Sequence, residues 1–243
     1  MAIKDPSVRC TAAEFIQRLK AMGVFEDVPQ VARYFSTDDN LFAAGNKLLG
    51  VKIGKVFPLA KPFMAMPLGD IEKMLDNPHY EVRMGAVSIM DFQARAKTVD
   101  KDRKKALFEL YVRRHDRINN WDLVDRAAPW VVGAYLADKP RDPLTQLAKS
   151  CNPWERRTAI VSTWFFIRAG DVADTFRIAE LLVLDSHEMV QKAVGSWLRE
   201  AGKHQPELLL DFLNRYSGKM PSPMLRPVIE NLGKDLPLKY TSA

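Results

Sequence analysis

The sequence predicts an all-α protein, and three observations carry that prediction. Apolar residues recur near the 3.6-residue period of a helix in one segment after another. No run of useful length alternates apolar and polar residues, as a half-buried strand would. A short motif, a small residue followed by a β-branched one, also returns at intervals typical of stacked helical repeats.

The first part of the chain, about residues 1–68, is expected to form short and irregular helices. A helix is predicted over residues 8–23, where Gly23 can end it, and a second over residues 30–35. Residues 36–45 have the pattern of a loop or a broken helix. Residues 53–66 are again helical in pattern, but prolines interrupt them, so kinked or short helices are expected there.

From about residue 69 to residue 232 the helical pattern becomes regular. Asn77-Pro78 closes a first short helix around Ile71, and Pro140 helps to stop a long one that begins at Trp121. Beyond the first short helix we expect helices over residues 81–96, 101–114, 121–137, 143–149, 154–169, 171–184, 187–201, 206–216 and 224–232.

The repeated motif sets a register for this regular part. It reads RMGAV at residues 83–87, RRTAI at residues 156–160 and VQKAV at residues 190–194, and Ala127 can be placed in the same register. The aligned residues Ala86, Ala127, Ala159 and Ala193 lie 41, 32 and 34 residues apart. Paired helices at such a period predict an α-solenoid of HEAT-like repeats, whose second helices line a concave side. We therefore predict one HEAT-like domain over residues 1–243.

Composition and charge limit the classes of function. The 36 Lys and Arg residues exceed the 30 Asp and Glu residues, and the net charge of +6 permits a polyanionic partner without requiring one. Cys10 and Cys151 are far apart in the sequence, which is typical of reduced cytosolic thiols and not of a disulfide framework. The sequence shows neither a secretory signal nor an apolar run long enough to span a membrane. We therefore expect a soluble, cytoplasmic protein with no membrane partner.

The sequence lacks the motifs of several common active sites. Its four His residues are scattered, with no HExxH and no Cys/His cluster, which argues against a zinc site. Neither GxGxxG nor GxxxxGK followed by Ser or Thr occurs, so neither a dinucleotide fold nor a P-loop is supported. No GxSxG frames a serine nucleophile.

A short stretch near the middle of the chain carries the clearest candidate site. Trp121 and Asp125 are four residues apart, which on a helix places the indole and the carboxylate on one face. A ring face and a fixed anion together suit a substrate that carries or develops positive charge. The simpler alternative is a helix start, with Asn119 or Asn120 as N-cap, Asp122 favourable to the helix dipole, and Trp121 as packing.

The repeat register favours a site over that simpler alternative. Two positions before the aligned alanine lie Asp125, Arg157 and Gln191 in successive repeats, after Met84 in an earlier one. Equivalent polar positions on three helices could also reflect ordinary surface exposure. Surface exposure does not account for a tryptophan one turn before the acid. The combination favours a site on the concave face.

Four segments resemble the AlkD-like DNA alkylation repair glycosylases, a family of HEAT-like fold. The early segment consists of ARY, which begins at Ala32, and LGV at residues 49–51. NWDLVD at residues 120–125 is similar to the family's W-D-x-V-D motif. WERRTAI at residues 154–160 resembles its W-x-x-R-x-A-I helix, and VQKAVGSWLRE at residues 190–200 resembles its Q-K-A-I-G-W-x-L-R-E helix. Together they span most of the chain.

The resemblance implies excision of N3- and N7-alkylated purines from double-stranded DNA, with no metal and no cofactor, by a protein that we expect to be monomeric. It also implies that the damaged base is not extruded into a tight pocket, which is the common strategy. By position, Asp125 matches the catalytic carboxylate, Trp121 a wall of the lesion site, and Arg157 a contact to the DNA backbone. Tyr34 matches a further aromatic residue of the cleft. The other expected DNA contacts are Arg156, Lys192, Gln191 and Trp197.

One position departs from the family pattern. The family's second tryptophan follows the glycine of the last helix, where this sequence has Ser196, and Trp197 comes one residue later. One residue is about 100° of rotation on a helix, so two orientations stay open: Trp197 faces the core, or it lines the cleft in place of the missing tryptophan. With this change, the sequence is also consistent with a relative of the family that binds DNA but cleaves the glycosidic bond poorly.

Three functions are therefore consistent with the sequence. The first is a glycosylase for cationic alkylated bases, and the second is a non-catalytic protein that binds DNA structures. The third is a HEAT scaffold for a protein partner, which would show an exposed apolar groove and no salt-sensitive DNA affinity. Arg157 has an alternative of its own, a structural ion pair with Asp125 across adjacent helices.

Overall fold

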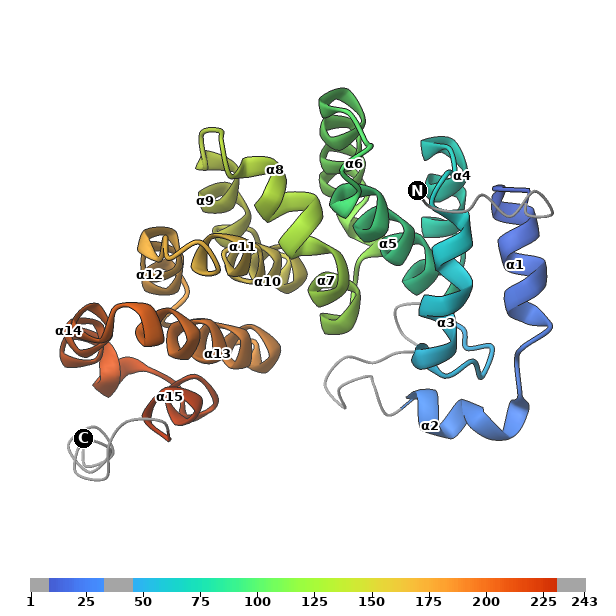
Figure 1. Cartoon of the computed structure of the whole chain (residues 1–243). Helices are drawn as coiled ribbons and strands as arrows, with labels where there is room; N and C mark the ends of the chain where they lie inside the picture. Colours follow the sequence, from blue (N-terminus) through green and yellow to red (C-terminus); the bar gives the residue numbers. More distant parts are fainter. Residues whose placement is uncertain (1–8, 33–45, 231–243) are drawn as a thin grey trace. The chain divides into compact units, whose positions relative to one another are not determined.

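The computed structural model describes residues 9–32 and 46–230, and its regular elements in these ranges are helices (Figure 1). Within them no β-strand is formed, and an isolated bridge joins Lys47 to His79. The prediction of an all-α protein is confirmed. The chain divides into two compact units, Met1–Ala127 and Ala128–Ala243. That the two units act as one domain stays a prediction.

The first unit contains the short helices predicted before residue 69 and the start of the regular part. Its elements are α1 (Ala12–Lys20), η1 (Phe25–Asp27), α2 (Val28–Ala32), α3 (Ile53–Ala60), η2 (Lys61–Phe63), α4 (Leu68–Leu75), α5 (Tyr80–Arg95), α6 (Lys101–Arg113), η3 (His115–Arg117) and α7 (Trp121–Ala128). Helix α1 is shorter than the predicted 8–23 because Thr11 caps it, accepting the N–H of Glu14. Residues 36–45, predicted as a loop or broken helix, lie outside the described residues.

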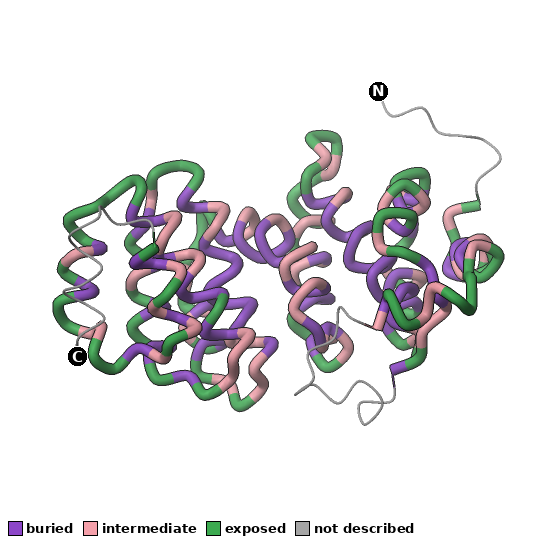
Figure 2. Tube along the Cα trace, turned by 90° about the horizontal axis from the view of Figure 1, so that it is seen from below, coloured by how far each residue is buried: buried purple, intermediate pink, exposed green. Residues whose placement is uncertain are grey.

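Helix α5 is buried over nearly its whole length and packs against α3, α4 and α6. Other helices, such as α1, carry buried residues on one side and exposed residues on the other (Figure 2). Gly85 lets α5 approach α1 closely, since a Cβ there would lie 2.3 Å from the ring of Phe15. The position of α5 is therefore fixed by packing from several sides.

The start of α5 is also fixed by a buried carboxylate. Glu81 accepts the backbone N–H groups of Leu49, Gly50 and Val51 at 2.9–3.3 Å. Gly50 has a φ of +75°, which lets three successive N–H groups converge on one anion. Burial raises the pKa of Glu81, although the backbone N–H donors oppose that shift. The LGV segment thus serves as a cradle for a structural acid.

Over its described residues the second unit is built from paired helices, and α15 is the last of them. Its elements are η4 (a π-helical segment, Pro129–Gly133), α8 (Ala134–Leu136), α9 (Asp142–Ala148), α10 (Pro153–Ser162), α11 (Trp164–Ile167), α12 (Ala173–Leu181), α13 (Glu188–His204), α14 (Pro206–Tyr216), η5 (Ser217–Lys219) and α15 (Ser222–Ile229). The prediction for residues 206–216 matches α14 at both ends. The predicted helix 154–169 instead divides at Thr163, whose hydroxyl donates to the carbonyl of Ile160 at 2.7 Å.

The predicted helix 121–137 is formed by α7, η4 and α8, but it contains a wide turn that the sequence analysis did not predict. Pro129 has no N–H and therefore cannot donate to the carbonyl four residues earlier. Beyond it, the N–H of Ala134 donates to the carbonyl of Pro129, five residues back. The wide turn therefore begins one helical turn after Asp125.

Candidate functional site

Helix α7 presents Trp121 and Asp125 on its more accessible side. Both side chains are half-buried, whereas Leu123 and Val124 are fully buried. The alternation follows from the helical period, which places residues four apart on one face. The structure therefore agrees with the predicted placement of the indole and the carboxylate. Their roles in catalysis stay predictions.

The first turn of α7 is held by Asp122. Its Oδ1 accepts the side-chain amide of Asn120 at 2.9 Å and the N–H of Leu123 at 2.8 Å. Its Oδ2 accepts the hydroxyl of Tyr80, the first residue of α5. Asp122 thus lies in the first turn, as the helix-start alternative predicted, whereas Asn120 donates its side-chain amide to Asp122 and its side-chain oxygen does not cap the helix. This helix start does not compete with a site on the face that carries Trp121.

Arg83 on α5 also reaches the segment before α7. Its guanidinium donates to the carbonyls of Asn77 and Pro78 at 3.0 and 3.1 Å, to the side chain of Asn46, and to Oδ1 of Asn119 at 3.3 Å. Arg83 is fully buried, and burial lowers its pKa to about 10. This buried cation therefore joins α5 to three chain segments, around Asn46, Asn77 and Asn119.

Arg126, the residue after Asp125, also contacts other helices of the first unit. Its guanidinium lies over the rings of Phe57 and Phe92, at 4.6 and 4.8 Å from the ring centroids. Its Nη2 pairs with Oδ2 of Asp91 at 3.1 Å. Helix α7 is thus attached to α3 and α5 through one side chain.

In the second unit, three of the predicted DNA contacts bond to the first turn of α13 or to Asp185 just before it. Arg156 makes two charge-assisted bonds to Asp185, at 2.6 and 3.0 Å. Gln191 is buried and donates to the carbonyl of Asp185 at 2.7 Å. Arg157 is 6% exposed and donates through Nη1 to the carbonyl of Met189. These polar side chains hold the start of α13, and their contact with DNA stays a prediction.

Lys192 and Trp197 lie further along α13 and differ in exposure. Lys192 is exposed and pairs with Glu188 one turn earlier. Trp197 donates through Nε1 to the carbonyl of Val161 at 3.2 Å and packs against a buried cluster that includes Ile167. Ser196 is half-buried. Trp197 thus packs inward, which is one of the two orientations that the sequence left open.

The remaining predicted aromatic residue, Tyr34, lies outside the described residues. Within the ranges that the structure describes, no group of His, Cys, Asp and Glu side chains is placed to hold a metal ion. In the same ranges, no helix combines the length and apolar character that a membrane span needs.

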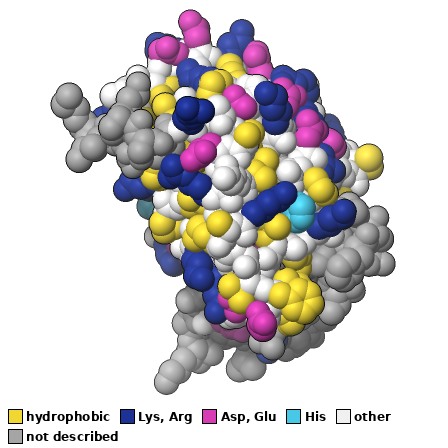
Figure 3. Space-filling model, turned by 90° about the vertical axis from the view of Figure 1, so that its right-hand side faces the viewer, with side chains coloured by type: hydrophobic (Ala, Val, Ile, Leu, Met, Phe, Trp, Pro, Cys, Tyr) yellow, Lys and Arg dark blue, Asp and Glu magenta, His cyan; other side chains and the backbone are white. Residues whose placement is uncertain are grey.

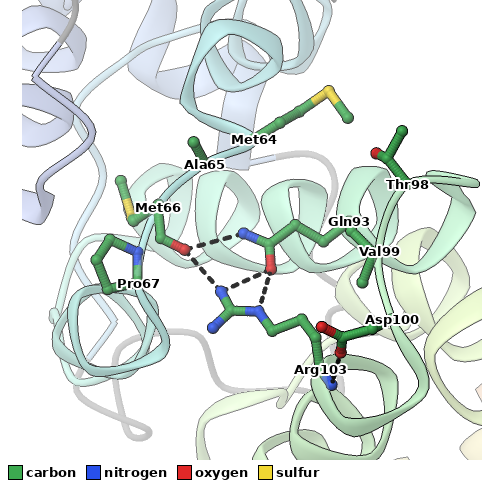
Figure 4. Close-up of a pocket in the computed structure, with 9 residues that line it drawn as sticks. All are labelled: Met64, Ala65, Met66, Pro67, Gln93, Thr98, Val99, Asp100 and Arg103. Atoms are coloured by element: carbon green, nitrogen blue, oxygen red, sulfur yellow. Dashed lines mark hydrogen bonds between the residues drawn. The ribbon is translucent and has the colours of Figure 1, made fainter.

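A pocket of about 360 Å³ lies in the first unit, between the α3–α4 connection and the start of α6 (Figure 4). Its polar groups bond to one another: Arg103 donates to Oε1 of Gln93 at 2.7 Å and to the carbonyl of Met66 at 2.7 Å. Gln93 donates to the same carbonyl at 3.0 Å. None of the predicted site residues lines this pocket, and its network serves to tie a loop to two helices.

The basic surplus of the sequence does not form a continuous patch on the face shown in Figure 3. Lys and Arg side chains are spread over that face with Asp and Glu side chains among them. Many of the described arginines are paired, as Arg114 is with Asp76 and Arg141 with Asp171 and Asp174. Charge alone therefore does not locate a site, and the residue pattern of α7 remains the better guide.

A comparison with protein families identifies the kind of protein. A family model described as "DNA alkylation repair enzyme" matches residues 15–232, a range that includes α7, α10 and α13. The chain belongs to the DNA alkylation repair enzyme family. The resemblance predicted from the four sequence segments is thereby confirmed, and membership implies DNA as a partner and a role in the repair of alkylation damage.

A solved structure supports the fold of this DNA alkylation repair family member. It is described as a predicted DNA alkylation repair enzyme from Enterococcus faecalis. The two structures superpose with a TM-score of 0.64 over 88% of this chain and 98% of the other, at 15% sequence identity. At that identity the likeness shows the fold alone. No curated protein matches this sequence.

Sequence reasoning missed the residues that hold the α7 face. Tyr80, Glu81, Arg83 and Asp91 were not singled out as site residues, yet all four are buried on α5 and each has a bonded or charged partner outside it. A signal was present: three charged residues, Glu81, Arg83 and Asp91, interrupt the mostly apolar residues 80–92. Charged residues are almost never fully buried unless they are paired.

Proposed function

We propose that this DNA alkylation repair family member is a glycosylase that excises cationic N3- or N7-alkylated purines from duplex DNA, as a cytoplasmic monomer. One observation carries the proposal. Trp121 and Asp125 share the accessible side of α7, while Leu123 and Val124 bury the other side. A carboxylate beside an indole suits a reaction in which a sugar becomes cationic.

The substrate supplies much of the driving force. Alkylation at N3 or N7 gives the purine a formal positive charge, so the base departs with the electrons of its glycosidic bond as a neutral leaving group. General acid catalysis is then unnecessary, and no histidine is required beside Asp125. The difficult part of the reaction is the cationic deoxyribose that remains, as in other glycoside cleavages.

Asp125 is proposed to stabilise that oxocarbenium-like sugar and to orient the water that attacks it. The water oxygen bonds to the anomeric carbon, and its proton passes to the carboxylate or to solvent. A well-placed charged group in such a site is typically worth about 3–4 kcal/mol of transition-state stabilisation. The face of Trp121 would add about 0.5–2 kcal/mol by packing against the cationic sugar.

DNA must be held although Asp125 repels phosphates. Arg157 is the leading candidate for a backbone contact, since a guanidinium can hold a phosphate through two N–H groups. Lys192 is exposed and is a further candidate. Each phosphate that is neutralised should steepen the salt dependence of binding by about 0.9 in a log–log plot.

The test is base release from methylated duplex DNA by the wild type and by Asp125→Asn. We expect the wild type to release 7-methylguanine or 3-methyladenine, and the variant to bind DNA equally well but to release neither base. Asp116→Asn is a matched control, because Asp116 is an exposed acid of the same unit that pairs with Arg114. A wild type that releases neither base would eliminate the enzymatic proposal.

The inward packing of Trp197 supports a second candidate, a DNA-binding protein without glycosylase activity. With Ser196 at the position of the family's second tryptophan, one of two expected aromatic walls is absent. That candidate predicts binding to duplex or branched DNA that Arg157→Ala weakens, with no base released by the wild type. The same two assays therefore distinguish the two functions.

A further inference from the structure

Helix α7 carries two carboxylates, Asp122 in its first turn and Asp125 three residues later. Asp122 is surrounded by donors: Asn120 and the N–H of Leu123 bond to one oxygen, and the hydroxyl of Tyr80 bonds to the other. Asp125, three residues later, is half-buried on the side that carries Trp121. The bonds to Asp122 give its carboxylate a role in holding the helix, and the proposed function assigns the chemistry to Asp125.

The bond between Tyr80 and Asp122 joins two elements that are far apart in the sequence. Tyr80 is the first residue of α5 and is fully buried. Its N–H donates to the carbonyl of Lys47 at 2.9 Å, and the next residue, Glu81, is held by the cradle of N–H groups at residues 49–51. The position of the Tyr80 hydroxyl is therefore fixed by contacts independent of α7.

The fixed Tyr80 hydroxyl sets the orientation of the α7 residues that form the candidate site. Asp122 directly follows Trp121 and precedes Asp125 by less than one helical turn, so a bond to Asp122 sets how this turn is rotated and tilted. A second tie, from Arg83 to Oδ1 of Asn119 at 3.3 Å, acts on the preceding segment. A displacement of about 1 Å in a catalytic group can lower a rate by about a hundredfold.

We propose that Tyr80 is a positioning residue, which acts through Asp122 to hold Trp121 and Asp125 in the orientation needed at the cationic sugar. This inference rests on the proposed glycosylase function. It assigns the first acid of the NWDLVD segment to the architecture of the site and the second acid to its chemistry. It also assigns a role in the site to a buried residue of α5 that does not touch the substrate.

The first test is Tyr80→Phe, which removes one hydroxyl from a buried ring. Single-turnover release of 7-methylguanine should fall by about tenfold to a hundredfold, while affinity for uncleaved duplex DNA stays at the wild-type value. Tyr111→Phe makes the same change at a fully buried tyrosine of α6 and should leave release unchanged. Adding Tyr80→Phe to Asp122→Ala should cause little further loss, because Tyr80 acts through Asp122.

A second measurement does not depend on activity. The indole N–H signal of Trp121, assigned in a ¹H–¹⁵N spectrum with Trp121→Phe, should shift or broaden in Tyr80→Phe, whereas that of Trp154 in the second unit should not. If the wild type releases base and Tyr80→Phe matches it in rate and in the Trp121 signal, the inference is overturned. If the wild type releases no base, the proposed function fails, and the Trp121 signal alone supports or overturns the positioning role.

Discussion

Arg126 of α7 and Asp91 of α5 form an ion pair within the first unit, with Nη2 and Oδ2 3.1 Å apart. The Asp91 side chain is fully buried, and Arg95 also donates to it at 2.8 Å. Burial raises the pKa of Asp91, while the two arginines oppose that shift. This pairing assigns the Arg126 side chain to the attachment of α7 to α5.

Replacing Asp91 with Ala should destabilise the protein strongly. The change leaves Arg126 beside two rings without its buried anion, and removing one partner of such a pair typically costs about 3–5 kcal/mol. We expect the midpoint of urea unfolding to fall with little change in its slope. The double variant Asp91→Leu/Arg126→Met should recover much of the loss. A single variant as stable as the wild type would show that the pair contributes little.

Glu81→Gln should also reduce stability, although the two side chains have nearly the same shape. An amide NH₂ would replace one oxygen that now accepts backbone N–H groups at residues 49–51, and an unsatisfied buried donor costs about 1–3 kcal/mol. Chemical denaturation measures the loss. Glu72→Gln on α4 is the control, because Glu72 pairs with Arg113 and Arg114 at the surface and should matter less. Equal losses in the two variants would argue against the cradle.

His79 should make stability depend on pH. Burial, with Lys20, Lys47 and Arg83 nearby, lowers the pKa of His79 below its ordinary 6.5. The unfolded chain therefore binds a proton at higher pH than the folded one. The stability contributed by neutral His79 is present above the ordinary pKa and is lost as the pH falls through the folded-state value.

We expect the free energy of unfolding to decrease less in His79→Asn than in the wild type when the pH is lowered from about 7.5 to about 5.5. Comparing the two proteins removes the contribution of other titrating groups, including Glu81 and Asp91. His204→Asn, at the end of α13, serves as the control variant and should follow the wild type. An unchanged pH dependence in His79→Asn would contradict the assignment.

Trp197→Phe should lower stability without lowering the rate of base release. The change removes the bond to the carbonyl of Val161 and part of the packing against the Ile167 cluster, at a cost of about 1–3 kcal/mol. Trp121→Phe should show the opposite pattern, a slower release with little loss of stability. A release defect in Trp197→Phe at full DNA occupancy would place its indole in the site.

The sequence alone determined which segments are helical and which side of α7 is accessible. Both follow from local periodicity: residues four apart share a helix face whatever lies nearby. The same geometry left two orientations for Trp197, and the structure shows the inward one. Periodicity was a poorer guide to where helices end, as at Thr163, because a side chain there competes with the backbone for hydrogen bonds.

Only the tertiary structure decided the partners of the polar residues. Tyr80 and Asp122 are 42 residues apart, Arg126 and Asp91 are 35 apart, and Arg156 and Asp185 are 29 apart. The sequence shows that such a side chain is polar, and the helical period indicates the face on which it lies. Neither identifies the group elsewhere in the chain that bonds to it. That choice depends on packing, because a buried charge is tolerated only where a partner compensates its lost hydration.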